Sequence, residues 1–149
     1  MPVSDLCNRN VVTIHKDASV WQAADLMRTL HVGDVVVVEE RDGQRLPVGI
    51  VTDRDIVVEI LAEEVDPKSV SVADFMSYEI VTVNEEDDIL NTIKLMRSEG
   101  IRRVPVVDGG GALVGILAVD DLIDFVAEML AGIGSLIRRE RSREEDTRP

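Results

Sequence analysis

The chain has 149 residues, of which 45% are hydrophobic and only 3% aromatic, so its core must consist of aliphatic side chains. This length fits one domain, or two small domains that share a core. The 29 acidic and 16 basic residues give a net charge of -13, which repels phosphates over most of the surface and excludes general binding of DNA or RNA.

The first predicted elements form a β-α-β-β-α unit. An apolar face at the 3-4 spacing of a helix runs from Val20 to Leu30, and the run 35–38 is typical of a strand buried on both sides. A polar turn is expected at 39–46. In chain order, the predicted elements are a strand at 11–14, a helix at 20–30, strands at 35–38 and 48–52, and a helix at 56–61.

The junction between the last strand and the last helix of this unit has the composition of a binding site. Thr52 and Asp53 can cap the helix, and Asp55 adds a carboxylate that can hold a vicinal diol. The helix start also presents N–H donors and a partial positive charge. These groups suit a ribose with a phosphate, although the same residues also suit a helix cap with no ligand.

The remainder of the chain repeats this unit. The segment 3–13 resembles 72–82, and the offset of 69 residues persists through Leu26-Met27-Arg28 and Leu95-Met96-Arg97. After a loop that is three residues shorter, Asp55 matches Asp121. The second unit is predicted to have strands at 80–83, 104–107 and 113–118, with a helix over 89–96. The polar stretch 63–71, which contains Pro67, is interpreted as a linker.

A longer helix is predicted at the C-terminal end. Eight apolar residues lie on one face of 122–137, and such a face needs a partner. Gly132 and Gly134 weaken this helix locally. From Arg138 onward the chain is almost entirely charged, and we expect it to fray into solvent.

The duplicated unit resembles the CBS domain, named after cystathionine beta-synthase. The resemblance is based on the stretches Gly49-Ile50-Val51-Thr52-Asp53-Arg54-Asp55, Gly100-Ile101-Arg102-Arg103-Val104-Pro105-Val106-Val107-Asp108 and Gly115-Ile116-Leu117-Ala118-Val119-Asp120-Asp121. It implies an α/β (α+β) fold in which tandem β-α-β-β-α repeats form one pseudo-two-fold Bateman module. The expected regions are repeat 1 at 3–62, a linker at 63–71, repeat 2 at 72–126, and a C-terminal helix with a charged tail at 127–149.

The family resemblance also implies two clefts that bind adenosine-type ligands. The first, the Asp55 cleft, is expected to combine Thr52 and Asp55 with Ile80 and Thr82. The second, the Asp121 cleft, is expected to combine Asp121 with Val11, Thr13 and Arg102. The motif aspartate would bind the ribose, and the threonine would lie near the phosphate.

Two departures from the family pattern make the expected clefts unequal. Ala118 stands where a hydroxyl residue is expected, which removes a hydrogen bond from the Asp121 cleft. Gly33 and Asp34 occupy the positions of Arg102 and Arg103, so the Asp55 cleft lacks positive charge unless Arg54 supplies it. These differences predict a better ribose site at Asp55 and a better phosphate site at Asp121.

The sequence therefore predicts a non-catalytic regulatory module that senses an adenine nucleotide. AMP, ADP or ATP is the expected ligand, with S-adenosylmethionine, NAD or a cyclic dinucleotide as alternatives, and no cofactor is required. A constitutive dimerisation protein with vestigial clefts is the second hypothesis. His15, His31 and Cys7 lack metal-ligand spacing.

We expect a homodimer formed through exposed helices, with a regulated protein as a further partner. No apolar run approaches the roughly 18 residues of a membrane span. The lone Cys7 leaves no internal disulfide, and the N-terminus has no signal-peptide pattern, so a cytoplasmic location is predicted.

Overall fold

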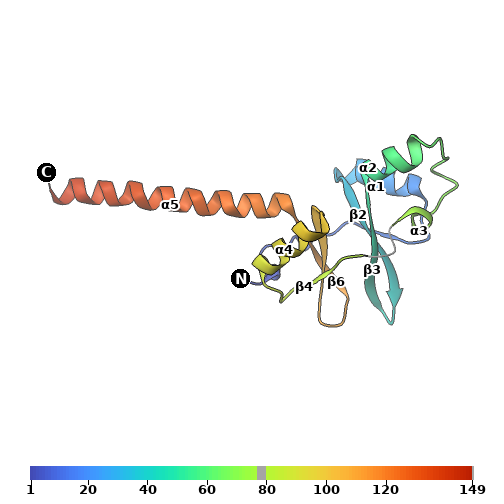
Figure 1. Cartoon of the computed structure of the whole chain (residues 1–149), viewed down its shortest axis with the longest axis horizontal. Helices are drawn as coiled ribbons and strands as arrows, with labels where there is room; N and C mark the ends of the chain where they lie inside the picture. Colours follow the sequence, from blue (N-terminus) through green and yellow to red (C-terminus); the bar gives the residue numbers. More distant parts are fainter. Residues whose placement is uncertain (77–79, 149) are drawn as a thin grey trace.

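The computed structural model describes residues 1–76 and 80–148 (Figure 1). Residues 77–79, which belong to the repeated stretch 72–82, and Pro149, at the end of the predicted tail, lie outside the described residues. The described chain forms two three-stranded sheets with helices, followed by one long helix. The predicted mixed α/β class is therefore confirmed.

The first sheet has the strand order β1-β2-β3, in which β2 pairs parallel with β1 and antiparallel with β3. The hairpin between β2 and β3 closes at Asp42 and Gly43, so the predicted polar turn over 39–46 was too long. Both residues have positive φ, 53° and 75°, as a two-residue hairpin turn requires. The elements are β1 (Thr13–His15), α1 (Val20–Leu30), β2 (Asp34–Arg41), β3 (Gln44–Thr52), α2 (Asp53–Asp55) and the π-helix η2 (Ile56–Leu61).

The second sheet repeats this order as β4-β5-β6, with the same parallel and antiparallel pairings. Its first strand contains only two residues, Val83 and Asn84, so most of the predicted strand at 80–83 lies before it. The elements are η1 (Val3–Asp5), α3 (Val72–Phe75), β4 (Val83–Asn84), α4 (Ile89–Glu99), β5 (Arg103–Val107), β6 (Leu113–Ala118) and α5 (Val119–Thr147).

Each sheet is completed by the segment that precedes the first strand of the other repeat. The Val72 N–H donates to the Ala18 carbonyl at 2.8 Å, and the Val3 N–H donates to the Asp87 carbonyl at 2.9 Å. Both valines are fully buried, Val72 in the core of the first sheet and Val3 in that of the second. The N-terminal segment therefore packs with the second repeat, although it belongs to the first repeat in sequence.

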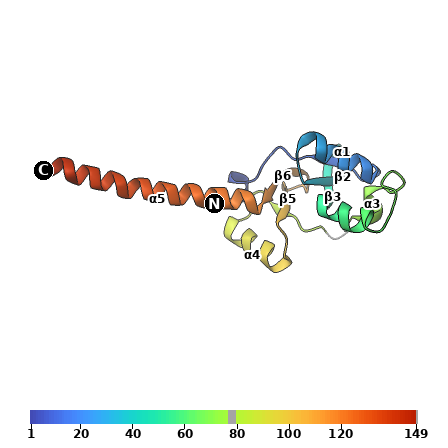
Figure 2. The ribbon, with the colours of Figure 1, turned by 90° about the horizontal axis from the view of Figure 1, so that it is seen from above.

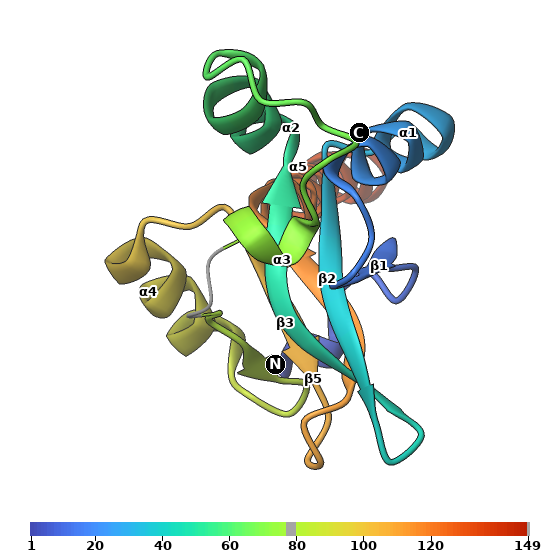
Figure 3. The same cartoon turned by 90° about the vertical axis from the view of Figure 1, so that its right-hand side faces the viewer.

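Strand β2 is buried on both faces, as its run of valines predicts. Val35 and Val37 pack under the helices of the first unit, whereas Val36 and Val38 face Leu113 of the second sheet. This shared layer joins the two sheets into one module (Figure 3). The ends of the strands are consequently held in fixed positions relative to one another.

Helix α5 extends well beyond its expected end. It passes through Gly132 and Gly134 and continues to Thr147, so the prediction of a frayed segment from Arg138 was wrong. Arginine and glutamate are good helix formers, and an ion pair between Arg148 and Glu144 (3.3 Å) supports the last turn. Figures 1 and 2 show the helix projecting away from both sheets.

Candidate functional site

The strand-to-helix junction at Thr52 is a reciprocal capping box. The Asp55 N–H donates to the Thr52 hydroxyl oxygen at 3.1 Å, and the Thr52 N–H donates to Asp55 Oδ2 at 3.0 Å. Thr52 and Asp55 therefore do cap the helix, as their residue types suggested. It uses one oxygen of the carboxylate, because Oδ1 of Asp55 makes no hydrogen bond within the described part of the chain. The cap holds Asp55 in place and leaves an acceptor for a ligand.

A cavity of about 440 Å³ lies beside this junction, and we keep the name Asp55 cleft for it. Its two walls come from different repeats, since β3 and α2 form one and the turn between α4 and β5 forms the other. Its volume falls in the range of small-molecule sites. The cavity is lined by Ile50, Thr52, Asp53, Arg54, Asp55, Gly100, Ile101, Arg102 and Arg103.

Arg102 lines the Asp55 cleft, and this differs from the sequence expectation. Its only ion pair among the described residues is with Asp120 at 3.9 Å, and both side chains are more than three-quarters exposed. Such a pair contributes little, so the guanidinium can turn to a bound anion. The sequence had assigned Arg102 to the Asp121 cleft, whose described lining does not include it, because a sequence offset identifies equivalent residues and not spatial neighbours. Arg54 lines the same cleft, as expected.

Asp34 and Arg103 occupy the same position in the two repeats, and they meet. Arg103 Nε lies 3.0 Å from Asp34 Oδ1, and both side chains are largely buried. Burial raises the pKa of the Asp34 carboxyl, although Arg103 acts to lower it and Asp53 adds a smaller upward effect. Sequence reasoning did not identify this ion pair. The signal was available, since the two residues are 69 apart and carry opposite charges.

The Asp121 cleft is smaller, with a volume of about 160 Å³. Asp121 Oδ2 accepts the Ala118 N–H at 2.8 Å, but alanine has no hydroxyl to complete the capping box. Val11 lines this cleft as predicted, whereas Arg102 does not. Its lining consists of Asn8, Asn10, Val11, Val12, Val32, Asp34, Arg103, Ile116, Ala118 and Asp121.

The remaining candidate residues lie elsewhere. Thr13 is in β1, where its hydroxyl accepts a hydrogen bond from Arg45 at 3.2 Å. Ile80 lines a separate cavity of about 460 Å³ that also includes Lys16 and Glu39. Thr82 is half-buried just before β4. The described lining of the Asp55 cleft includes neither Ile80 nor Thr82.

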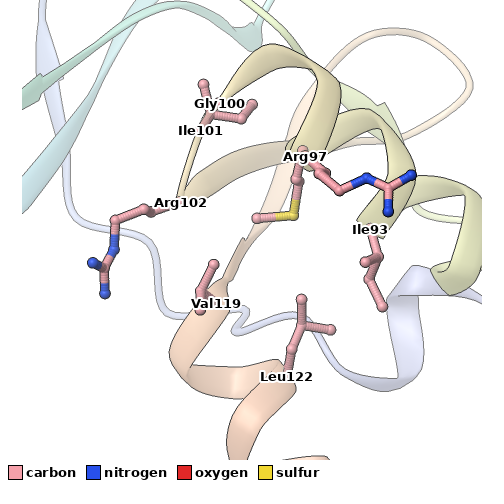
Figure 4. A pocket seen from close by; sticks show the side chains of 8 residues that line it. Ile93, Arg97, Gly100, Ile101, Arg102, Val119 and Leu122 are labelled. Carbon is pink, nitrogen blue, oxygen red and sulfur yellow. The ribbon is translucent and has the colours of Figure 1, made fainter.

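An apolar groove of about 280 Å³ adjoins the Asp55 cleft, and we call it the root groove (Figure 4). Val119 and Leu122 of α5 point toward Ile93 of α4 across it. Gly100, Ile101 and Arg102 line both the groove and the Asp55 cleft. The α4–β5 turn thus forms a common wall between the cleft and the start of α5. The groove is lined by Ile93, Met96, Arg97, Gly100, Ile101, Arg102, Val119 and Leu122.

Other kinds of site find no support in the described residues. Within 1–76 and 80–148, no group of three His, Cys, Asp or Glu side chains could hold a metal ion. Burial raises the pKa of the Cys7 thiol, which packs beside Gly115. No helix in the same residues is long and apolar enough to cross a membrane.

Comparisons with known proteins agree with the duplicated architecture. The family model of the CBS domain matches residues 3–62 and 72–128. An uncharacterised protein of Methanopyrus kandleri is 34% identical over 88% of this chain, which spans 65% of that relative's length.

Two solved structures share the fold. A CBS domain protein from Pyrobaculum aerophilum, complexed with AMP, is 29% identical and has a TM-score of 0.73, with 82% of this chain and 90% of that chain covered. A hexameric CBS-CP12 protein from bloom-forming cyanobacteria is 30% identical and also has a TM-score of 0.73, with 99% and 88% covered.

Proposed function

Because the chain belongs to the CBS domain family and contains two such repeats, we propose that it is a non-catalytic regulatory module that binds an adenosine-type nucleotide in the Asp55 cleft. AMP, ADP and ATP are the proposed ligands. S-adenosylmethionine, NAD and a cyclic dinucleotide are the alternatives. The chemistry of the cleft residues supports this proposal, and no catalytic group is required for it.

The observation that carries the proposal is that Thr52, Asp55 and Arg102 line one cavity. Asp55 is held by its cap and can accept hydrogen bonds from the two ribose hydroxyls through Oδ1. The guanidinium of Arg102 can pair with phosphate oxygens, a contact to which arginine is well suited. The apolar side chains of Ile50 and Ile101 offer a surface for an adenine base.

The solved relative that is complexed with AMP supports the choice of ligand class. That protein is 29% identical and shares the fold over most of both chains. AMP contains the three groups for which the Asp55 cleft has partners: an apolar base, a ribose diol and a phosphate. We therefore propose AMP as the first nucleotide to test.

A bound nucleotide would act on α5 through the α4–β5 turn. Gly100, Ile101 and Arg102 contact both the Asp55 cleft and the root groove, where α5 begins. A ligand that draws Arg102 toward its phosphate therefore changes the wall against which Val119 and Leu122 pack. If α5 can take two positions against this wall, the ligand shifts the balance between them by the difference in its binding free energy to the two.

We also propose that the module works as a homodimer formed through exposed helices, with a regulated protein as a further partner. Apolar side chains are exposed on η2, at Val57, Val58 and Leu61, and along α5. Surfaces of this kind mark contacts with other proteins. The cyanobacterial relative is described as hexameric. A cytoplasmic location remains a prediction.

A constitutive interaction protein is the second candidate function. The observation that favours it is the exposed apolar stripe of α5, which needs no nucleotide to attract a partner. In that case the clefts would be vestigial, and Thr52 and Asp55 would act only as a helix cap.

A thermal-shift panel separates the two functions. The panel contains AMP, ADP, ATP, NAD, S-adenosylmethionine and cyclic dinucleotides. A nucleotide at 100 times its dissociation constant stabilises the folded state by ~2.7 kcal/mol, which raises the melting temperature by about 5–10 °C for a chain of this size. We expect at least one adenosine ligand to produce this shift, and no shift with any of them would favour the constitutive protein.

The control variant for this experiment is Asp74→Ala. Asp74 caps α3 as Asp55 caps α2, since its Oδ2 accepts the Ser71 N–H at 3.1 Å, but it does not line the Asp55 cleft. Asp55→Ala and the control Asp74→Ala each lose a similar helix cap. Only Asp55→Ala should also lose the ligand-induced shift.

A further inference from the structure

Helix α5 exposes a continuous apolar stripe along its middle. Seven of its large apolar side chains are between 50% and 66% exposed, although they occupy one side of a regular helix. The stripe continues at its N-terminal end into the root groove through Leu122 (Figure 4). The seven residues are Ile123, Val126, Met129, Leu130, Ile133, Leu136 and Ile137.

The spacing of the stripe is that of a helix that pairs with another helix. Apolar residues recur in alternating steps of four and three, the heptad pattern of paired helices. The five positions that define this pattern are Leu122, Val126, Met129, Ile133 and Leu136. Ile123, Leu130 and Ile137 widen the stripe on one side. A stripe of this width favours a long helix as the partner, in preference to a short peptide.

Charges are distributed unevenly along the same helix. Acidic residues occupy its beginning, at Asp120, Asp121, Asp124 and Glu128. A basic group follows the stripe, in which four arginines, Arg138, Arg139, Arg141 and Arg143, outnumber the single Glu140. A second acidic group, 144–146, ends the helix. At the other end, Arg97 and Arg102 line the root groove. The order from the groove to the tip is therefore basic, acidic, apolar, basic and acidic.

Opposite charges along two copies of α5 face each other only when the helices run in opposite directions. If a second α5 lay parallel and in register, each acidic group would face an acidic group and each arginine group would face arginines. If it lay antiparallel and centred near Ala131, Asp120 would lie at the same level along the pair as the partner's Arg141, and the partner's 144–146 would approach the level of Arg97 and Arg102. The apolar stripe would still face itself, because its centre is close to the same residue. Opposite charges favour the antiparallel arrangement, and like charges disfavour the parallel one.

We propose that α5 pairs with α5 of a second copy of this chain, antiparallel and crossing near Ala131. Gly132 lies beside the stripe near the crossing point and adds no side chain there. The pairing specifies the proposed homodimer and is independent of nucleotide binding, so it is tested on the nucleotide-free protein. A helix 29 residues long that projects from the module is free along most of its length to be paired.

Spin-label distances test the orientation directly. Cys7→Ala removes the natural thiol, and Ser142→Cys places a label on the exposed tip of α5. In the antiparallel pair, the two labels are about 35 Å apart, because about 22 residues at 1.5 Å each separate them along the axis. A parallel pair would bring them within about 20 Å. The proposal expects the long distance, and the short distance or the absence of any dipolar signal would overturn it.

A charge exchange tests the register. Asp120→Arg and Arg141→Asp each place like charges at the same level of the dimer, at its two equivalent ends. Each variant should raise the dimer dissociation constant by roughly 5- to 30-fold, the effect of two exposed pairs. The double variant restores opposite charges and should return to within about threefold of the original value. If the double variant were weakened as much as both single variants combined, Asp120 would not face Arg141.

Light scattering with matched variants tests which face of α5 forms the contact between the two copies. Met129→Glu with Ile133→Glu places two charges in the stripe and should give a monomer. Ala131→Glu with Ser135→Glu places the same charges, at the same spacing, on the opposite face and should leave the dimer intact. Circular dichroism on both confirms that α5 still forms. A monomeric original chain, or equal effects of the two double variants, would contradict the proposal.

Discussion

At the scale of single residues, the contact between Asp34 and Arg103 shows what a duplicated chain does at its pseudo-two-fold axis. Residues that lie close to such an axis meet their own equivalents from the other repeat. Identical side chains at this position would have placed two like charges 3.0 Å apart, whereas divergence of the repeats has produced an ion pair. The neighbouring equivalents, Gly33 and Arg102, have also diverged, and this gives the two clefts different charges.

The raised pKa of Asp34 predicts a pH-dependent effect of Asp34→Asn. A carboxyl group whose pKa is raised by folding opposes folding when ionised, and this effect disappears as the pH falls below its ordinary value of 3.8. We therefore expect Asp34→Asn to have a larger free energy of unfolding than the original chain at pH 7. The difference should shrink as the pH falls through the folded-state pKa toward 3.8.

Urea unfolding at several pH values measures this difference. Asp25→Asn, on the exposed side of α1, is the control and should show no such convergence. If Asp34→Asn destabilised the protein at pH 7, attraction by Arg103 would outweigh the burial of the carboxyl group.

Asp55→Ala is the second prediction at this scale. It removes the proposed hydrogen bonds between the carboxylate and the ribose, which are worth roughly 1.5–3 kcal/mol of binding free energy. Titration calorimetry with AMP should show a correspondingly weaker affinity. An unchanged affinity would rule out a ribose at Asp55, even if AMP bound elsewhere on the protein.

At the scale of elements, the sequence pattern identified the repeated order correctly but not the extent of every element. Strands β2 and β3 were predicted from their apolar cores alone, because their polar ends are held by pairing in the hairpin, which residue type does not reveal. The π-helical form of η2 was also missed, since apolar spacing does not separate it from an α-helix. The continuation of α5 past Arg138 was missed because we gave charge more weight than helix propensity.

The candidate site was predicted only within each repeat. The capping box of Thr52 and Asp55 is local in sequence, so the pattern identified it. Arg102 reaches the same cleft through the packing of two repeats, and an offset of 69 residues carries no information about that contact. Asp34 and Arg103 show the same limitation, because a contact across the axis depends on how the two sheets face each other.

The segments around Val3 and Val72 each pack in the core of the other repeat, and this predicts where two matched core variants should act. Val3→Ala and Val72→Ala each remove two fully buried methyl groups, so each should lower the free energy of unfolding by about 2 kcal/mol. Amide exchange should locate the effects in different places. Val3→Ala should loosen β5 and β6, and Val72→Ala should loosen β2 and β3. The reverse assignment would show that each segment supports its own repeat.

At the scale of the whole molecule, the two clefts are unequal. The Asp55 cleft has about 440 Å³, a hydroxyl at Thr52 and a basic side chain at Arg102. The Asp121 cleft has about 160 Å³ and Ala118 in place of the hydroxyl, and its one arginine, Arg103, is paired with Asp34. Thr52, Asp55 and Arg102 thus line one cleft, where the sequence had suggested a division between two.

We therefore predict one strong nucleotide site per chain and a second, weaker one. Titration calorimetry with AMP should give a binding curve dominated by one site, and two equal, independent sites would contradict this. Ala118→Thr supplies the missing hydroxyl to the Asp121 N–H. It should raise the melting temperature without ligand through the new cap, and strengthen the weaker site by up to about tenfold. Thr52→Ser, which keeps the hydroxyl, is the control and should change neither site.

The position of Val3 also sets an order of events during synthesis of the chain. The core of the first unit draws its buried residues from 14–76, so this unit has all of these residues before the strands of the second sheet are made. The core around Val3 includes Val83, Val104 and Leu117, which leave the ribosome after the whole of the first unit. The segment around Val3 is therefore translated before the first unit but is expected to fold after it, once β6 has emerged.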